Sequence, residues 1–212
     1  MKLIKTVTKV ILIIFLINVY ANITSYAATD EAGVFISTNY TGNDRNIPYN
    51  SARVGLQRLG YRITTSISNT TTKKEMMDYI KSSGRNYAFF ARVHGDDGII
   101  VADKNNSSTE IRSTEITGNW HLVVIPSCSS GESTKFANAF KVNTANGTNK
   151  AFLGYYKEVL TDVNTKWNEL FWSYVGSRSL RDATLDASDY WTSPGTCPVR
   201  MYGDKTWWGW AW

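Results

Sequence analysis

The chain of 212 residues has only two cysteines, Cys128 and Cys197, and only two histidines. It also lacks internal repeats, low-complexity tracts and linkers rich in proline or glycine. The absence of repeats excludes a repeat architecture. Two cysteines are too few for a dense disulfide framework. The length remains sufficient for one domain with its own hydrophobic core.

The first 27 residues have the pattern of a secretory signal peptide. Lys2, Lys5 and Lys9 form a basic start, and the apolar run Val10–Val19 is shorter than the ~20 residues of a spanning helix. Ser25-Tyr26-Ala27 then provides small residues on either side of Tyr26, as a cleavage site requires. We predict a signal peptide over 1–27 and a secreted mature domain over 28–212. An uncleaved N-terminal anchor is the alternative.

Lysine and arginine are not clustered in the sequence. The formal net charge is +5, but the predicted leader holds three of the 23 basic residues and none of the 18 acidic ones. The mature chain would therefore carry 20 basic against 18 acidic residues. This balance does not predict a nucleic-acid partner.

Strand and helix patterns alternate along the rest of the chain. A capping box formed by Thr72 and Glu75 opens one of the predicted helices. Strands are predicted over 33–37, 61–67, 87–93, 99–101, 121–125, 150–156 and 199–202, and helices over 50–59, 72–80, 109–117, 132–140, 164–175 and 179–190, with 38–48 rich in turns. The alternation predicts an α/β protein with a mostly parallel central sheet, in which ligands bind at the carboxyl ends of the strands.

Two apolar strands end in a reactive side chain followed by small residues. Phe89–Val93 leads into His94-Gly95, and Leu122–Ile125 leads into Pro126-Ser127-Cys128. If the two strands are parallel neighbours, His94 and Cys128 leave the sheet at the same edge. His121 lies seven residues before Cys128, over ~20 Å away in an extended strand, which excludes it as a partner of the thiol.

A thiol beside an imidazole is the arrangement of a cysteine nucleophile with its general base. A helix predicted shortly after Cys128 would also favour the thiolate. Gly95 has no Cβ, so its backbone N–H can approach a developing oxyanion, and the Cys128 N–H can be the second donor. The alternatives are a buried structural cysteine and a disulfide between Cys128 and Cys197.

These motifs resemble the caspase-like (clan CD) cysteine peptidases, which include caspases, metacaspases, legumain, clostripain and gingipains. The segment His94–Ile100 is similar to the one around the family's catalytic histidine, and Pro126–Gly131 is similar to its cysteine motif. Leu59–Ile63 and Tyr202-Gly203-Asp204 add weaker matches.

The resemblance, over about residues 33–206, implies a three-layer caspase-hemoglobinase fold and endopeptidase activity without a metal or organic cofactor. It also implies a dyad of His94 and Cys128 with the Gly95 N–H in the oxyanion hole. Three features depart from the family pattern: Ser127 stands where alanine or glycine is usual, the caspase Gln-Ala-Cys-Arg-Gly signature is absent, and Lys205 replaces a frequent proline.

Four charged residues near the motifs are candidates for a specificity pocket. Arg45 would favour an acidic P1 side chain, whereas Asp44, Asp96 and Asp97 would favour a basic one. For each of the four, a solvated loop charge is the alternative.

The tail carries four tryptophans within its last six residues: Trp207, Trp208, Trp210 and Trp212. It is expected either to fold onto the domain or to bind a membrane surface, a glycan or a protein. The leading functional hypothesis is a secreted endopeptidase that acts on peptides or proteins. The rivals are a non-catalytic effector that makes surface contacts through the tail, and a hydrolase or acyltransferase that uses the same thiol on an ester.

Overall fold

The computed structural model describes residues 30–68, 70–82, 86–103, 106–142, 149–189 and 198–210. The predicted signal peptide over 1–27, Cys197 and Trp212 lie outside these ranges. Within them, every helix is too short or too polar to cross a membrane.

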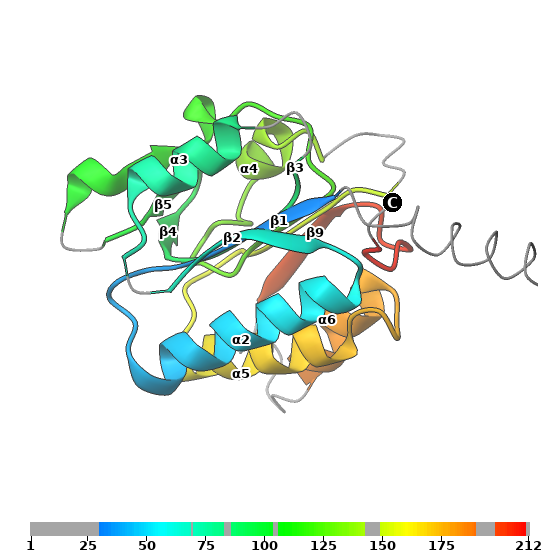
Figure 1. Cartoon of the computed structure of the whole chain (residues 1–212). Coiled ribbons are helices and arrows are strands. Elements are labelled where there is room, and N and C mark those ends of the chain that lie inside the picture. The colour runs from blue at the N-terminus through cyan, green and yellow to red at the C-terminus, as the bar shows by residue number, and fades with distance from the viewer. Residues whose placement is uncertain are drawn as a thin grey trace, which may run out of the picture.

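A six-stranded sheet forms the centre of the molecule (Figure 1). Its strand order is β2-β1-β3-β7-β8-β9, and only β9 runs antiparallel to its neighbour. The strands are β1 (Glu31–Ile36), β2 (Arg62–Ile67), β3 (Asn86–Arg92), β7 (Leu122–Ile125), β8 (Ala151–Tyr155) and β9 (Val199–Gly203). The predicted mostly parallel α/β sheet is confirmed.

Helices cover both faces of the sheet and make a three-layer fold, as predicted (Figure 1). One face carries α2 (Gly42–Arg58), α5 (Thr161–Tyr174) and α6 (Leu180–Asp189), and the other carries α3 (Lys73–Lys81) and α4 (Lys135–Ala139). Alternate residues of the central strands face opposite layers: Phe90 and Val124 belong to the core under α2 and α5, whereas Phe89 and Val123 belong to the other. The capping box of Thr72 and Glu75 is confirmed at the start of α3.

The stretch of sequence that connects β3 to β7 forms a small second sheet. It consists of β4 (His94–Asp96), β5 (Ile99–Val101) and β6 (Glu110–Arg112), all antiparallel, with short 3₁₀ turns over Ser107–Thr109 and Ser113–Glu115. The helix predicted over 109–117 is therefore wrong. Ile111 is buried opposite Ile100, and this tertiary pairing overrides the local preference.

The first helix of the described residues, α2, starts at Gly42, well before the predicted 50–59 segment, so the turn-rich prediction for 38–48 is only partly right. Pro48 lies inside this helix and is buried. A proline there removes the N–H that would bind the carbonyl of Asp44 one turn earlier. The carbonyl of Asp44 instead accepts a hydrogen bond from Arg92, a residue of the candidate site.

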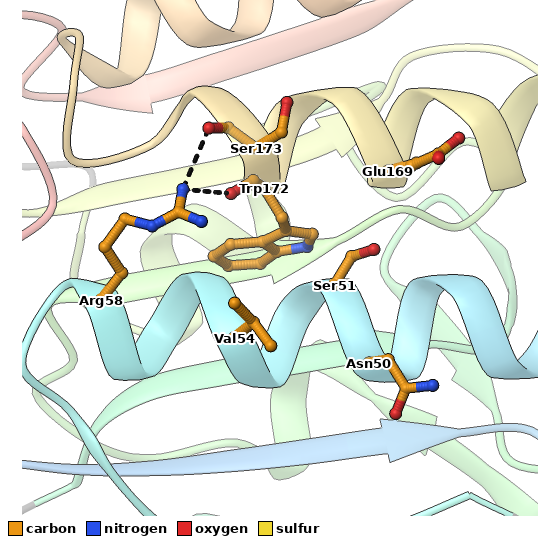
Figure 2. Close-up of a pocket in the computed structure, with 7 residues that line it drawn as sticks. All are labelled: Asn50, Ser51, Val54, Arg58, Glu169, Trp172 and Ser173. Carbon is orange, nitrogen blue, oxygen red and sulfur yellow. Dashed lines mark hydrogen bonds between the residues drawn. The ribbon is translucent and has the colours of Figure 1, made fainter.

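The helices α2 and α5 cross so closely that their contact depends on a glycine. A Cβ added to Gly55 would lie 2.5 Å from Cε3 of Trp172. A shallow groove of about 290 Å³ runs beside this contact, with Val54 and Trp172 on its walls (Figure 2). Arg58 donates to the carbonyls of Trp172 (3.3 Å) and Ser173 (2.9 Å) at one end of the groove.

Gly55→Ala tests this contact. Alanine normally stabilises a helix interior relative to glycine, but here the added methyl meets the Trp172 ring. We expect the free energy of unfolding to fall by about 1–3 kcal/mol in urea denaturation. Val54→Ala, at the neighbouring position with 53% exposure, is the control and is expected to change it by less than about 0.5 kcal/mol. A more stable Gly55→Ala protein would contradict the packing.

Candidate active site

The strands that precede the two candidate catalytic residues are parallel neighbours. In the register of β3 and β7, Phe90 lies opposite Val124. His94 and Cys128 each follow this pair by four positions. Both therefore leave the sheet at its carboxyl edge, as the sequence predicted. His94 is itself the first residue of strand β4, where it pairs with Val101.

Gly95 brings the histidine segment against the cysteine segment. A Cβ added at Gly95 would lie 2.9 Å from Cβ of Ser127 and 3.0 Å from the carbonyl oxygen of Cys128. No larger residue fits without moving one of the two segments. The glycine is therefore needed for the close approach of its backbone to the cysteine loop. The predicted approach of its N–H to an oxyanion stays a prediction.

The thiol of Cys128 is half-buried and forms no disulfide with any residue that the structure describes. Its sulfur lies 3.5 Å from the N–H of Val159 and 3.9 Å from the Val159 carbonyl. Val159 directly precedes Leu160, the N-cap residue of α5. The helix expected to begin soon after Cys128 is only the short α4, so the helix start next to the thiol belongs to α5.

Hydrogen bonds fix the backbone around Cys128. The N–H of Ser127 donates to Ile125 (2.8 Å), and the N–H of Ser129 donates to Lys157 (3.3 Å). Ser129 has a φ of 51°, a left-handed conformation that is uncommon for a residue other than glycine. The buried amide of Asn164, on α5, donates to the carbonyl of Pro126 at 2.7 Å. Asn164 of α5 therefore holds the loop before the nucleophile, and Lys157, in the segment that precedes α5, holds it after the nucleophile.

The imidazole of His94 stacks on the ring of Tyr40, with centroids 5.2 Å apart and an interplanar angle of 22°. The guanidinium of Arg92 lies 4.4 Å from the Tyr40 centroid. Burial raises the pKa of Tyr40, Arg92 opposes part of the shift, and a charge on Cys128 adds to it. Tyr40 therefore contacts His94 directly and is coupled to Cys128 electrostatically.

Arg92 is fully buried and joins three elements beneath the site. One guanidinium nitrogen donates to the carbonyl of Asp44, which Pro48 leaves without its helical donor. The other donates to the carbonyl of Thr161 (3.1 Å) and to Oγ1 of Thr165 (2.9 Å). Burial lowers the pKa of Arg92, while Tyr40, Tyr155 and Asp44 oppose this shift. The arginine thus ties the starts of α2 and α5 to the end of β3.

His121 lies at the opposite edge of the sheet, as the strand length predicted. It precedes β7, its Nδ1 is 3.9 Å from Oδ2 of Asp30, and its ring is 6.5 Å from that of Trp207. Burial lowers the pKa of His121.

The four candidate specificity residues differ in what they contact. Asp97 binds Ser133 (2.5 Å) and Lys135 (2.6 Å) beyond the cysteine loop. Burial alone would raise the pKa of Asp97, but these hydrogen bonds outweigh it and lower the pKa. The Asp97 carboxylate is thus engaged in linking the histidine and cysteine segments.

The other three candidates make contacts with neighbouring residues or with α5. Oδ1 of Asp44 accepts from Thr165 (2.7 Å), and Nε of Arg45 donates to Asn46 (3.4 Å). Asp96 is exposed, and its carboxylate accepts the N–H of Asp97 (2.8 Å). Among these three charges, Asp96 is the most accessible to a substrate.

Sequence reasoning did not identify Tyr40, Arg92, Val159 and Asn164 as parts of the site. Arg92 had a signal, because a lone arginine in an otherwise apolar strand requires buried partners. The others had no local signal, since each acts through a contact with a distant segment.

Two serines of the cysteine loop provide a matched test of this geometry. Oγ of Ser130 donates to the carbonyls of Ile125 (2.6 Å) and Ser127 (2.8 Å), whereas the equally buried Oγ of Ser127 has no hydrogen-bond partner among the described residues. We expect Ser130→Ala to lower the free energy of unfolding by about 1–2 kcal/mol, and Ser127→Ala to leave it unchanged or raise it by up to about 1 kcal/mol. Equal losses in both variants would contradict the loop structure.

Substitutions of Tyr40 test the stacking on His94. Because the chain has only two histidines, proton NMR can follow the His94 ring with His121 as an internal reference. We expect Tyr40→Ala to remove the upfield ring-current shift of His94, Tyr40→Phe to keep it, and neither to move His121. A His94 resonance that is unchanged in Tyr40→Ala would show that the two rings do not stack.

In the described part of the chain, His, Cys, Asp and Glu side chains form no group of three or more that could hold a metal ion. No protein-family model matches the chain, and no curated protein is significantly similar to it in sequence. The function is therefore argued from the chemistry of the site.

Proposed function

We propose that this protein is a secreted cysteine endopeptidase of the caspase-like kind, with Cys128 as nucleophile and His94 as general base. The observation that carries the proposal is the packing of Gly95, the residue after His94, against Ser127 and Cys128 at the edge where β3 and β7 end. The resemblance of the two motifs to clan CD peptidases supports peptides as the substrate. The N-terminal leader pattern supports secretion.

Catalysis would begin with transfer of the Cys128 proton to His94 and attack of the sulfur on the scissile carbonyl carbon. The N–H of Val159, 3.5 Å from the sulfur, would stabilise the negative charge before attack. The oxyanion of the tetrahedral intermediate would accept hydrogen bonds from the N–H groups of Gly95 and Cys128.

The intermediate then collapses, the carbon–nitrogen bond breaks, and protonated His94 gives its proton to the leaving amine. The acyl group remains on the sulfur as a thioester. His94 next takes a proton from water, the resulting hydroxide attacks the thioester carbon, and the carboxylic acid leaves as Cys128 regains its proton. No metal or organic cofactor is required in this sequence.

The surroundings of the thiol support an extended substrate. Leu160, next to the Val159 contact, is 73% exposed, which is unusual for a large aliphatic side chain. It offers an apolar surface beside the sulfur for a substrate side chain. The first rival function, an effector without turnover, does not need the thiol. The second, an acyl transferase that acts on esters, uses the same thiol. The labelling test below separates them from the peptidase.

Labelling with a peptidyl acyloxymethyl ketone tests the dyad. Mass spectrometry is expected to find the label on Cys128, with no labelling in Cys128→Ala and a rate about 10²-fold or more lower in His94→Ala. His121→Ala removes the other histidine, and Cys197→Ser the other cysteine, so both are controls expected to keep the wild-type rate.

Full-rate labelling in His94→Ala, or a label that moves to Cys197, would overturn the dyad. Labelling without cleavage of any peptide in a positional library would instead favour the effector or the acyl transferase. In that library, a preference for acidic P1 residues would support Arg45 as the pocket charge, and a preference for basic ones would support Asp44 or Asp96.

A further inference from the structure

The tryptophan-rich tail is fixed to the domain at the edge of the sheet opposite the candidate dyad. In Figure 1 the red C-terminal segment lies at the right, and β4 and β5 lie at the left. The carbonyl of Trp207 accepts the N–H of Leu180 (2.9 Å), and Oδ1 of Asp204 accepts the N–H of Trp207 (3.2 Å). Gly209 has a φ of 85°, and a Cβ there would lie 3.1 Å from Leu180. The backbone that carries the indoles is therefore anchored.

The anchored tail buries one indole and exposes two others. Trp207 is only 6% exposed and belongs to the hydrophobic core, so the expectation that the tail folds onto the domain holds for this residue. Trp208 and Trp210 are 45% and 41% exposed. An exposed indole costs hydrophobic free energy, and a fixed one loses little entropy when it binds a ligand.

Trp208 differs from Trp210 in its surroundings. It lines a hollow of about 560 Å³ formed with the start and one side of α6. The polar residues of this hollow are Ser177, Arg178, Ser179, Asp182, Asp186 and Asp189. Trp210 does not line this hollow, and its ring lies near Gly176 instead.

Several polar groups of the hollow are held in place. Arg178 forms an ion pair with Asp186, and its guanidinium lies 5.0 Å from the centroid of the Tyr174 ring. The hydroxyl of Ser179 donates to Asp182 at 2.8 Å. Hydrogen-bond donors and acceptors with fixed directions therefore line the same hollow as the exposed indole of Trp208.

We propose that this hollow binds a pyranose unit of an extracellular polysaccharide. The apolar C–H face of the sugar would stack on Trp208, and its hydroxyls would bind the carboxylates of α6 and the Arg178 guanidinium. Sugar hydroxyls both donate and accept, which matches a wall that carries both kinds of group. The same acidic side chains would repel the anionic lipids of a membrane surface, and the wall is more polar than apolar, which suits the core of a protein interface less well.

Sedimentation of the full-length protein with insoluble chitin, cellulose and peptidoglycan tests the proposal. We expect retention on at least one polymer that persists in about 0.5 M NaCl, because salt weakly screens stacking and hydrogen bonds to sugar hydroxyls, which carry no charge. Trp208→Ala is expected to weaken the apparent affinity about tenfold, and Asp182→Asn to weaken it to a smaller extent. Trp210→Ala, an equally exposed indole outside the hollow, is the matched control and is expected to bind as wild type.

Absence of wild-type retention on all three polymers would overturn the proposal. Equal losses in Trp208→Ala and Trp210→Ala, loss of retention in salt, or preferential binding to phosphatidylglycerol vesicles would also overturn it. Because the hollow lies at the edge opposite Cys128, labelling of Cys128 in Trp208→Ala should match wild type. The glycan site and the proposed peptidase function can therefore fail independently.

Discussion

The parallel pairing of β3 with β7 is the constraint on which the rest of the site depends. Parallel strands carry whatever follows them to one edge of a sheet, and the register of Phe90 with Val124 sets His94 and Cys128 at matching positions. The helices add no side chain to this pair. The segment before α5 supplies the N–H of Val159 beside the sulfur, and α5 supplies the amide of Asn164 that binds the carbonyl of Pro126.

A buried charge beneath the pair unites these elements. Arg92 is expensive to bury, and it is tolerated because carbonyl oxygens, a hydroxyl and the face of Tyr40 surround it. One of those carbonyls, that of Asp44, is available because Pro48 cannot donate to it. Arg92 of β3 can therefore bind this carbonyl and link α2 to α5. The ring stacked on His94 is held by the same arginine.

The sequence was most informative where local pattern decides structure. The apolar runs ending at Val93 and Ile125 predicted the central strands, their order predicted the shared edge, and Thr72 with Glu75 predicted the start of α3. It was least informative where a distant partner decides. Strand β6 forms because Ile111 pairs with Ile100, and the helix beside the thiol is α5 rather than α4, which no local pattern indicates.

The most direct measurement of the central claim is chemical cross-linking with 1,3-dibromoacetone, whose two reactive carbons flank a single carbonyl. In a Cys197→Ser background the reagent can attach first only to the thiol of Cys128. If the imidazole lies beside the sulfur, the second carbon alkylates it, and mass spectrometry finds one peptide pair joined through Cys128 and His94. A reagent attached to Cys128 whose second end is hydrolysed, or joined to another side chain, would contradict the dyad.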